Sequence, residues 1–146
     1  MKISIGCDHG AIDLKTSVVE HLTKKGYEVV DFGTYTTASC DYPEFAEAAA
    51  RAVASGECEK GIVLCTTGIG VSITANKVKG IRCALVGDLM SARLTREHND
   101  TNVLAIGAGV TGEMLALQIA ETWLDTEFAG GRHQRRVDKL MAYEND

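Results

Sequence analysis

The sequence contains little proline, few aromatic residues and no long apolar run. Pro43 is the only proline among 146 residues, and aromatic residues make up 5% of the chain. This composition excludes a proline-rich linker or a low-complexity segment that would divide the chain. No apolar run approaches the roughly 20 residues that a membrane-spanning helix requires. We therefore expect a single domain without a membrane-spanning helix.

Basic residues are also scarce. The chain has 15 lysines and arginines against 20 acidic residues, which gives a formal net charge of -5. A surface that binds DNA or RNA normally needs a net basic footprint, so we expect no nucleic-acid partner. Small anions can still bind where basic groups gather locally.

The cysteines form no CxxC pair, and no hydrophobic leader precedes them. Their number is five, which is odd, and they are widely spaced. This pattern indicates neither a disulfide framework nor a zinc site. We expect a reduced, cytoplasmic protein.

The residues that are present predict an α/β fold. Hydrophobic residues make up 45% of the chain, which suits one compact domain over residues 1–146. Apolar runs alternate with segments of helical spacing. The expected strands are 2–7, 27–32, 61–65, 81–86 and 103–106, and the expected helices include 14–22, 45–53, 71–77, 89–97 and 114–124. We predict a Rossmann-like, flavodoxin-like three-layer domain with a five-stranded parallel sheet in the order 2-1-3-4-5, followed by a C-terminal helical tail.

In such sheets ligands bind beyond the carboxyl ends of the strands, where the strand order reverses. This rule brings Cys7–His9 and Cys65–Gly70 together, although they lie far apart in the sequence. The loop after Cys65 is not a dinucleotide fingerprint, because Ile73 stands where the last glycine is needed. Nor is it a P-loop, and a cysteine phosphatase would need arginine at the place of Val71. A small-residue loop before a helix can still bind an anion through backbone N–H groups.

Single residues in these segments have two interpretations. Cys65 could be a thiolate favoured by the following helix, or a small buried hydrophobic residue. Asp8 and His9 could bind a ligand, or could be a helix cap and a surface imidazole. The clusters at 96–100 and 130–136 could be functional, or simply a polar helix end and an exposed basic stretch.

Geometry constrains the cluster that contains His98. A helix that leaves the carboxyl edge of the sheet returns to the amino edge before the next strand, and about ten residues of helix cover roughly one strand length. His98 and Asn99 should therefore lie at the opposite edge from Cys65. If His98 works with Cys65, it must come from a second subunit, which predicts a homodimer with shared active sites that could pair further into a tetramer.

Taken together, the motifs resemble the type B ribose-5-phosphate isomerases, whose relatives act on allose 6-phosphate and galactose 6-phosphate. The resemblance covers nearly the whole chain. The segments that carry it are Gly6–Gly10, Asp41–Pro43, Cys65–Ile73, Ala75–Lys77, Ser91–Arg93, Arg96–Asn102 and Gly130–His133.

The resemblance implies an aldose–ketose isomerase that works through a cis-enediolate, with no metal and no cofactor, because the hydrogen moves as a proton. By position, Cys65 is the base that moves the proton between C2 and C1, with Thr67 beside it, and His98 is the acid that opens the sugar ring. The implied substrate-binding residues are Asp8, His9, Thr66, Thr67, Gly68, Ile69, Gly70, Asn99, Arg132 and Arg136. Of these, His9, Arg132 and Arg136 are implied to bind the phosphate, for which arginine is well suited.

Two positions depart from the family's usual pattern. Thr66 stands where relatives commonly have glycine, and Gly109 stands where they usually have a phosphate-binding arginine. The second change removes a cation and should open space for a longer sugar, or shift the phosphate toward Arg132 and Arg136. Ribose 5-phosphate is therefore the expected substrate, with allose 6-phosphate, galactose 6-phosphate or a tetrulose 4-phosphate as alternatives. A non-catalytic module that binds anions or nucleotides is the alternative from another class.

Overall fold

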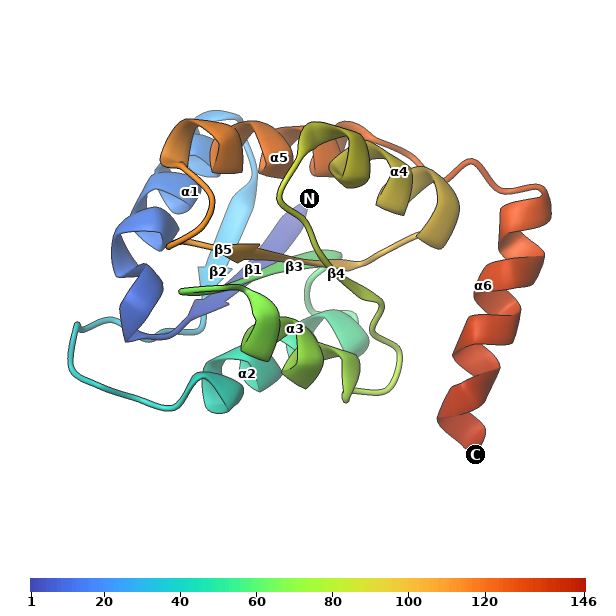
Figure 1. Cartoon of the computed structure of the whole chain (residues 1–146), viewed down its shortest axis with the longest axis horizontal. Coiled ribbons are helices and arrows are strands. Elements are labelled where there is room, and N and C mark those ends of the chain that lie inside the picture. Colours follow the sequence, from blue (N-terminus) through green and yellow to red (C-terminus); the bar gives the residue numbers. More distant parts are fainter.

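The computed structural model describes residues 1–146 and shows one parallel sheet between two layers of helices (Figure 1). The strands are β1 (Lys2–Cys7), β2 (Glu28–Asp31), β3 (Lys60–Cys65), β4 (Cys83–Leu85) and β5 (Val103–Gly107). The helices are α1 (Ile12–Lys24), α2 (Tyr42–Ala54), α3 (Ile69–Asn76), α4 (Leu89–Asn99), α5 (Glu113–Asp125) and α6 (Arg132–Ala142), with short 3₁₀ turns at His9–Ala11 and Tyr143–Asn145. The predicted α/β class with a C-terminal helical tail is confirmed.

The sheet is buried on both faces because its strands are apolar on both sides. In β3, Ile62 and Leu64 pack in the core beneath α1, α4 and α5, whereas Val63 and Cys65 pack in the core beneath α2 and α3. This alternation follows from the two-residue period of a strand. The side chain of Cys65 therefore points toward the layer that contains α2 and α3.

The predicted strand order is wrong at one edge. The observed order is β2-β1-β3-β5-β4, so β5 lies between β3 and β4. All five residues of β5 are buried, whereas β4 has only three residues and its Leu85 is 45% exposed. The longer apolar strand takes the interior place, because an interior strand must bury both faces and pair on both sides. The side-chain amide of Asn76 pairs with the backbone N–H and C=O of Cys83 in β4.

The prediction that β1 and β3 are neighbours is confirmed, and it places the site. Cys7 pairs in register with Leu64, and Cys65 pairs with Gly107. The carboxyl ends of β1, β3 and β5 consequently form one continuous edge. The loops that follow these strands meet there.

The last helix stands apart from the sandwich. Figure 1 shows α6 on the far side of the molecule from the carboxyl ends of the strands. Val137 is the only residue of α6 that is buried. No helix of the chain is both long enough and apolar enough to cross a bilayer.

Candidate functional site

Cys65 is the last residue of β3 and begins a loop of hydrogen-bond donors. Its side chain is buried, with 6% exposed, and its Sγ accepts the N–H of Gly68 at 3.1 Å. The N–H of Ile69 is bound by Thr67 Oγ1 at 3.2 Å. Four other N–H groups of this segment have no acceptor in the chain, namely those of Thr66, Thr67, Gly70 and Val71. The loop therefore presents several donors, at the start of α3, to an anionic group.

The conformation of the loop depends on Gly68. This residue has a φ of +77°, and a Cβ there would lie 2.8 Å from the backbone carbon of Ile106 and 2.9 Å from the nitrogen of Gly107. Only glycine combines this backbone conformation with such close packing against β5. The loop is therefore held against the neighbouring strand, with the Gly68 N–H aimed at Cys65.

Asp8 and His9 lie beside this loop, as predicted. Asp8 is buried, with 8% exposed, and its Oδ1 accepts the N–H of Gly10 at 2.9 Å, so it does serve as a cap. Its Oδ2 makes no hydrogen bond within the chain. His9 is exposed, and its Nδ1 accepts the N–H of Cys40 at 3.2 Å. This bond leaves the Nε2 atom of His9 as the donor toward a ligand.

The side chain of Thr66 fills the space between two glycines. A Cβ at Gly10 would collide with Thr66 Oγ1, and a Cβ at Gly109 would lie 2.8 Å from Thr66 Cγ2. The N–H of Gly109 also donates to the carbonyl of Thr66 at 2.8 Å. Thr66 therefore fills the space directly beside Gly109, and the expectation that Gly109 admits a longer sugar stays a prediction.

Two cavities flank the loop at the carboxyl edge of the sheet. One, of about 310 Å³, includes His9, Gly10, Thr37, Ala108 and Glu113 in its lining. The other, of about 290 Å³, includes Thr67, Ile69, Leu85, Gly107 and Val110. The first contains polar groups that can hold a hydroxylated ligand. The second is mostly apolar and open to the surface.

The five cysteines are unpaired, and they differ in environment. Cys7 ends the neighbouring strand β1 and is fully buried. Burial raises the pKa of Cys7 to about 11, and the nearby Lys15 only partly opposes this shift. Cys7 is therefore a protonated core residue, whereas Cys65 lies at the mouth of the loop. No group of three or more His, Cys, Asp or Glu side chains is arranged to hold a metal ion.

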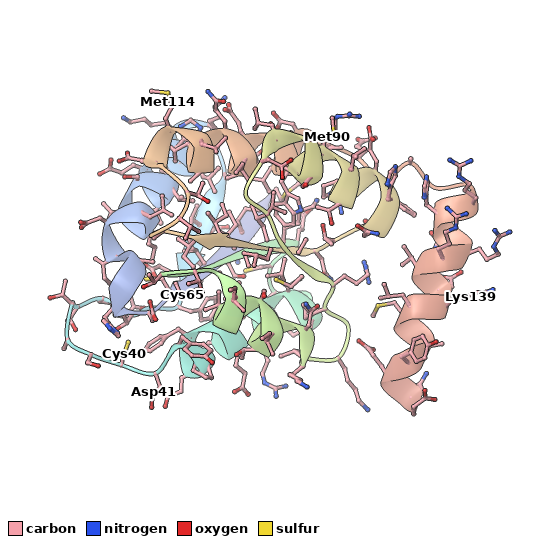
Figure 2. All side chains as sticks on the ribbon, viewed as in Figure 1. Cys40, Asp41, Cys65, Met90, Met114 and Lys139 are labelled. Carbon is pink, nitrogen blue, oxygen red and sulfur yellow. The ribbon has the colours of Figure 1, made fainter.

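The remaining predicted residues lie at the opposite edge. His98 and Asn99 are in the last turn of α4, where the carbonyl of Asn99 accepts from Arg82 just before β4. Strand β3 begins at that edge and ends at Cys65, and its six residues span about 17 Å. In Figure 2, Cys65 and the labelled Cys40 and Asp41 lie on one side of the molecule, and α6 with Lys139 lies on the other. One chain does not bring His98 and Cys65 together.

Arg132 and Arg136 also lie far from Cys65. Arg132 is the first residue of α6 and Arg136 the fifth, both are exposed, and neither makes a hydrogen bond or an ion pair within the chain. Positive side chains at the N-terminus of a helix oppose the helix dipole. This arrangement favours binding of an anion to the start of α6.

Sequence reasoning missed two residues of the site region. Tyr42 begins α2, and its ring carbons would lie 2.6 Å from a Cβ at Gly70, so the ring forms a wall of the loop. The Asp-Tyr-Pro motif at 41–43 signals a helix start, but not this contact. His133 stacks on His98, with ring centroids 4.4 Å apart. The basic residues around His133 predicted an exposed basic stretch, and no sequence pattern predicted that its ring would stack on another.

Comparison with known proteins gives one consistent result. The model of the Ribose/Galactose Isomerase family matches residues 3–140. Ribose-5-phosphate isomerase B of Escherichia coli is 49% identical over 143 residues, which cover 98% of this chain and 96% of that protein. The structure of Clostridium thermocellum ribose-5-phosphate isomerase B has a TM-score of 0.98 and 54% identity, covering 99% of this chain and 98% of that one.

A further structure is that of the Mycoplasma genitalium ribose-5-phosphate isomerase B with bound ribulose 5-phosphate. It has a TM-score of 0.94 and 41% identity, and the alignment covers 99% of this chain and 97% of that chain. The similarity thus extends over the complete fold, including α6. It is not confined to one motif.

Proposed function

Because the chain belongs to the ribose/galactose isomerase family, we propose that residues 1–146 form one isomerase domain that interconverts ribose 5-phosphate and ribulose 5-phosphate. The single observation that carries this proposal is the Cys65 loop. It combines a thiol at the end of β3 with free N–H donors on the following residues. A base next to preorganised donors is the arrangement that enolisation of a sugar requires.

In the proposed reaction, Cys65 as the thiolate removes the C2 proton of the open-chain aldose. The electrons move into the C1 carbonyl, and the resulting enediolate oxygens accept hydrogen bonds from the loop N–H groups, Thr67 among them. Cys65 then returns the proton to C1, the O2 proton passes to O1, and the C2 carbonyl forms. Asp8 holds sugar hydroxyls through its free Oδ2. No net oxidation occurs, because the electrons remain within the substrate, while the proton held by Cys65 can exchange with solvent.

Opening of the sugar ring and binding of phosphate need groups that lie at the other edge. We assign the ring-opening acid to His98, contact with the same end of the sugar to Asn99, and phosphate binding to His9, Arg132 and Arg136. His9 belongs to the same edge as Cys65, whereas the other four do not. The complete site therefore takes residues from two chains, and we expect a homodimer.

Exposed apolar side chains support a partner at the carboxyl edge. They are Ile69, Ile73, Leu85, Leu89, Met90, Val110 and Met114, each at least 40% exposed. They belong to α3, to the end of β4, to the loop after β5, and to the first turns of α4 and α5. A cluster of this kind is unusual on a chain that acts alone. A second copy would cover it and bring its His98 to the Cys65 loop.

The proposed thiolate needs a reducing compartment, so we place the enzyme in the cytoplasm. The proposed isomerase activity is tested by two measurements. They are the conversion of ribose 5-phosphate and the incorporation of solvent deuterium at C1 of the product. Cys65→Ala should abolish both, and Cys83→Ala, which changes a cysteine at the opposite edge, should leave both within about twofold of wild type. A wild-type chain that exchanges no proton with any pentose, hexose or tetrose phosphate would contradict the proposal and favour a non-catalytic anion-binding module.

A further inference from the structure

The imidazole ring of His133 lies flat against that of His98. Their centroids are 4.4 Å apart and their planes are inclined by 16°. His98 belongs to the last turn of α4, and His133 to the first turn of α6. The mechanism above uses His98, Arg132 and Arg136, but it gives no role to His133.

This stack is one of three contacts by which the end of α4 holds the chain that leads into α6. Three successive residues of α4 take part. The contacts are Arg96 Nε to the carbonyl of Thr126 at 3.1 Å, the N–H of Ala129 to the carbonyl of Glu97 at 3.1 Å, and the stack of His98 on His133. The first two hold backbone before the helix, and only the stack holds a side chain of α6 itself.

The rest of α6 is loosely attached. Val137 is its only buried residue, and a hydrogen bond from the N–H of Gly80 to Glu144 Oε1, at 2.8 Å, secures the segment after it. In Figure 1 the helix runs alongside the sandwich rather than on it. The direction of Arg132 and Arg136 therefore depends on how the first turn of α6 is fixed to α4.

The surroundings of His133 disfavour its protonated form. Desolvation lowers the pKa of His133, electrostatic interactions with His98, Arg132 and Arg136 lower it further, and Glu97 opposes this shift. A neutral ring stacked on His98 can orient that side chain without competing for its proton.

We propose that His133 is a positioning residue, whose stack on His98 holds the ring-opening acid and the phosphate-binding arginines as one unit for the active site of the partner chain. This inference rests on the proposed function. It assigns to His133 no contact with the substrate. A flat ring at position 133 is sufficient for the role, and a titratable ring is not required.

The test separates ring opening from proton transfer. Ribulose 5-phosphate has its O5 blocked by phosphate and cannot close a furanose ring, so exchange of its C1 proton with deuterium needs Cys65 but no ring opening. Conversion of ribose 5-phosphate needs both steps. We expect His133→Ala to reduce kcat for ribose 5-phosphate by about 10- to 100-fold and to raise KM for both sugars, while the maximal exchange rate on ribulose 5-phosphate falls less than threefold.

His133→Phe keeps a flat ring and should restore most of the lost kcat, and Gln134→Ala, an exposed neighbour, should behave as wild type. Three results would overturn the inference. His133→Ala could have the kcat of the wild type, or it could lose equal activity in both assays. Alternatively, His133→Phe could be as impaired as His133→Ala. Circular dichroism of every variant identifies a loss of folding. If His133→Ala misfolds, the kinetics of His133→Phe decide the test in its place. A wild-type chain that is inactive in both assays would instead contradict the proposed function.

Discussion

The methyl group of Thr66 lies 2.8 Å from the place that a Cβ would take at Gly109. The two residues come from loops after β3 and β5, and both depart from the pattern expected by resemblance. Their contact shows that they are not independent differences. The side chain at position 66 limits what position 109 can accept.

We predict that Gly109→Arg alone reduces kcat/KM for ribose 5-phosphate, because the new side chain must displace Thr66 and with it the donor loop. Adding Thr66→Gly should recover activity to near the wild-type level. The four kcat/KM values of a double-mutant cycle measure this coupling, which we expect to be about 1 kcal/mol or more. Additive effects of the two substitutions would contradict the steric link.

Gly68→Ala should inactivate the enzyme far more than it destabilises the fold. The substitution disfavours the positive φ of residue 68 and pushes a methyl group against Ile106 and Gly107. The N–H that points at Cys65 Sγ must then move. We expect kcat to fall by about 100-fold or more, since one misplaced donor costs this much in related chemistry. Steady-state kinetics and a thermal melt test the point, and a kcat within a few fold of wild type would refute it.

The two cysteines at neighbouring strand ends should differ in reactivity. Because the pKa of Cys7 is raised to about 11, its thiol stays protonated at pH 7 to 9 and is also buried. Iodoacetamide should inactivate the enzyme by modifying Cys65 and leave Cys7 unmodified until the protein is unfolded. Peptide mass spectrometry after timed labelling gives the answer. Labelling of Cys7 in the folded protein at the rate of Cys65 would contradict it.

Thr101→Val tests the core near the amino edge. The indole N–H of the fully buried Trp123 donates to Thr101 Oγ1 at 3.0 Å. Valine keeps the shape but leaves that donor without a partner, so unfolding free energy should fall by about 1 to 3 kcal/mol. Urea unfolding followed by the fluorescence of Trp123 measures the loss. Thr101→Ser, which keeps the hydroxyl, is the matched control and should lose clearly less.

The layers of the fold could be predicted from the sequence because they depend on local patterns. Alternating apolar runs such as 61–65 define strands wherever they pack, and the adjacency of β1 and β3 follows from connection rules. The order of β4 and β5 could not be read in this way. It depends on how much of 81–86 pairs as a strand, and the structure pairs only Cys83–Leu85.

Contacts between the side chains of distant loops could not be predicted from the sequence either. Thr66 and Gly109 could be recognised singly as unusual, but their contact depends on the register of β3 with β5. The stack of His98 on His133 likewise depends on how the chain turns between α5 and α6. The separation of His98 from Cys65, by contrast, follows from helix length alone and was predictable.

The central claim is that one site takes Cys65 from one chain and His98 from another. The most direct measurement mixes the Cys65→Ala and His98→Ala chains in equal amounts, with reassembly verified by native mass spectrometry. Each variant alone should have little activity. Random pairing should yield heterodimers in which one of two sites is intact, so activity should recover to about a quarter of the wild-type value. Confirmed heterodimers with no recovered activity would contradict the claim.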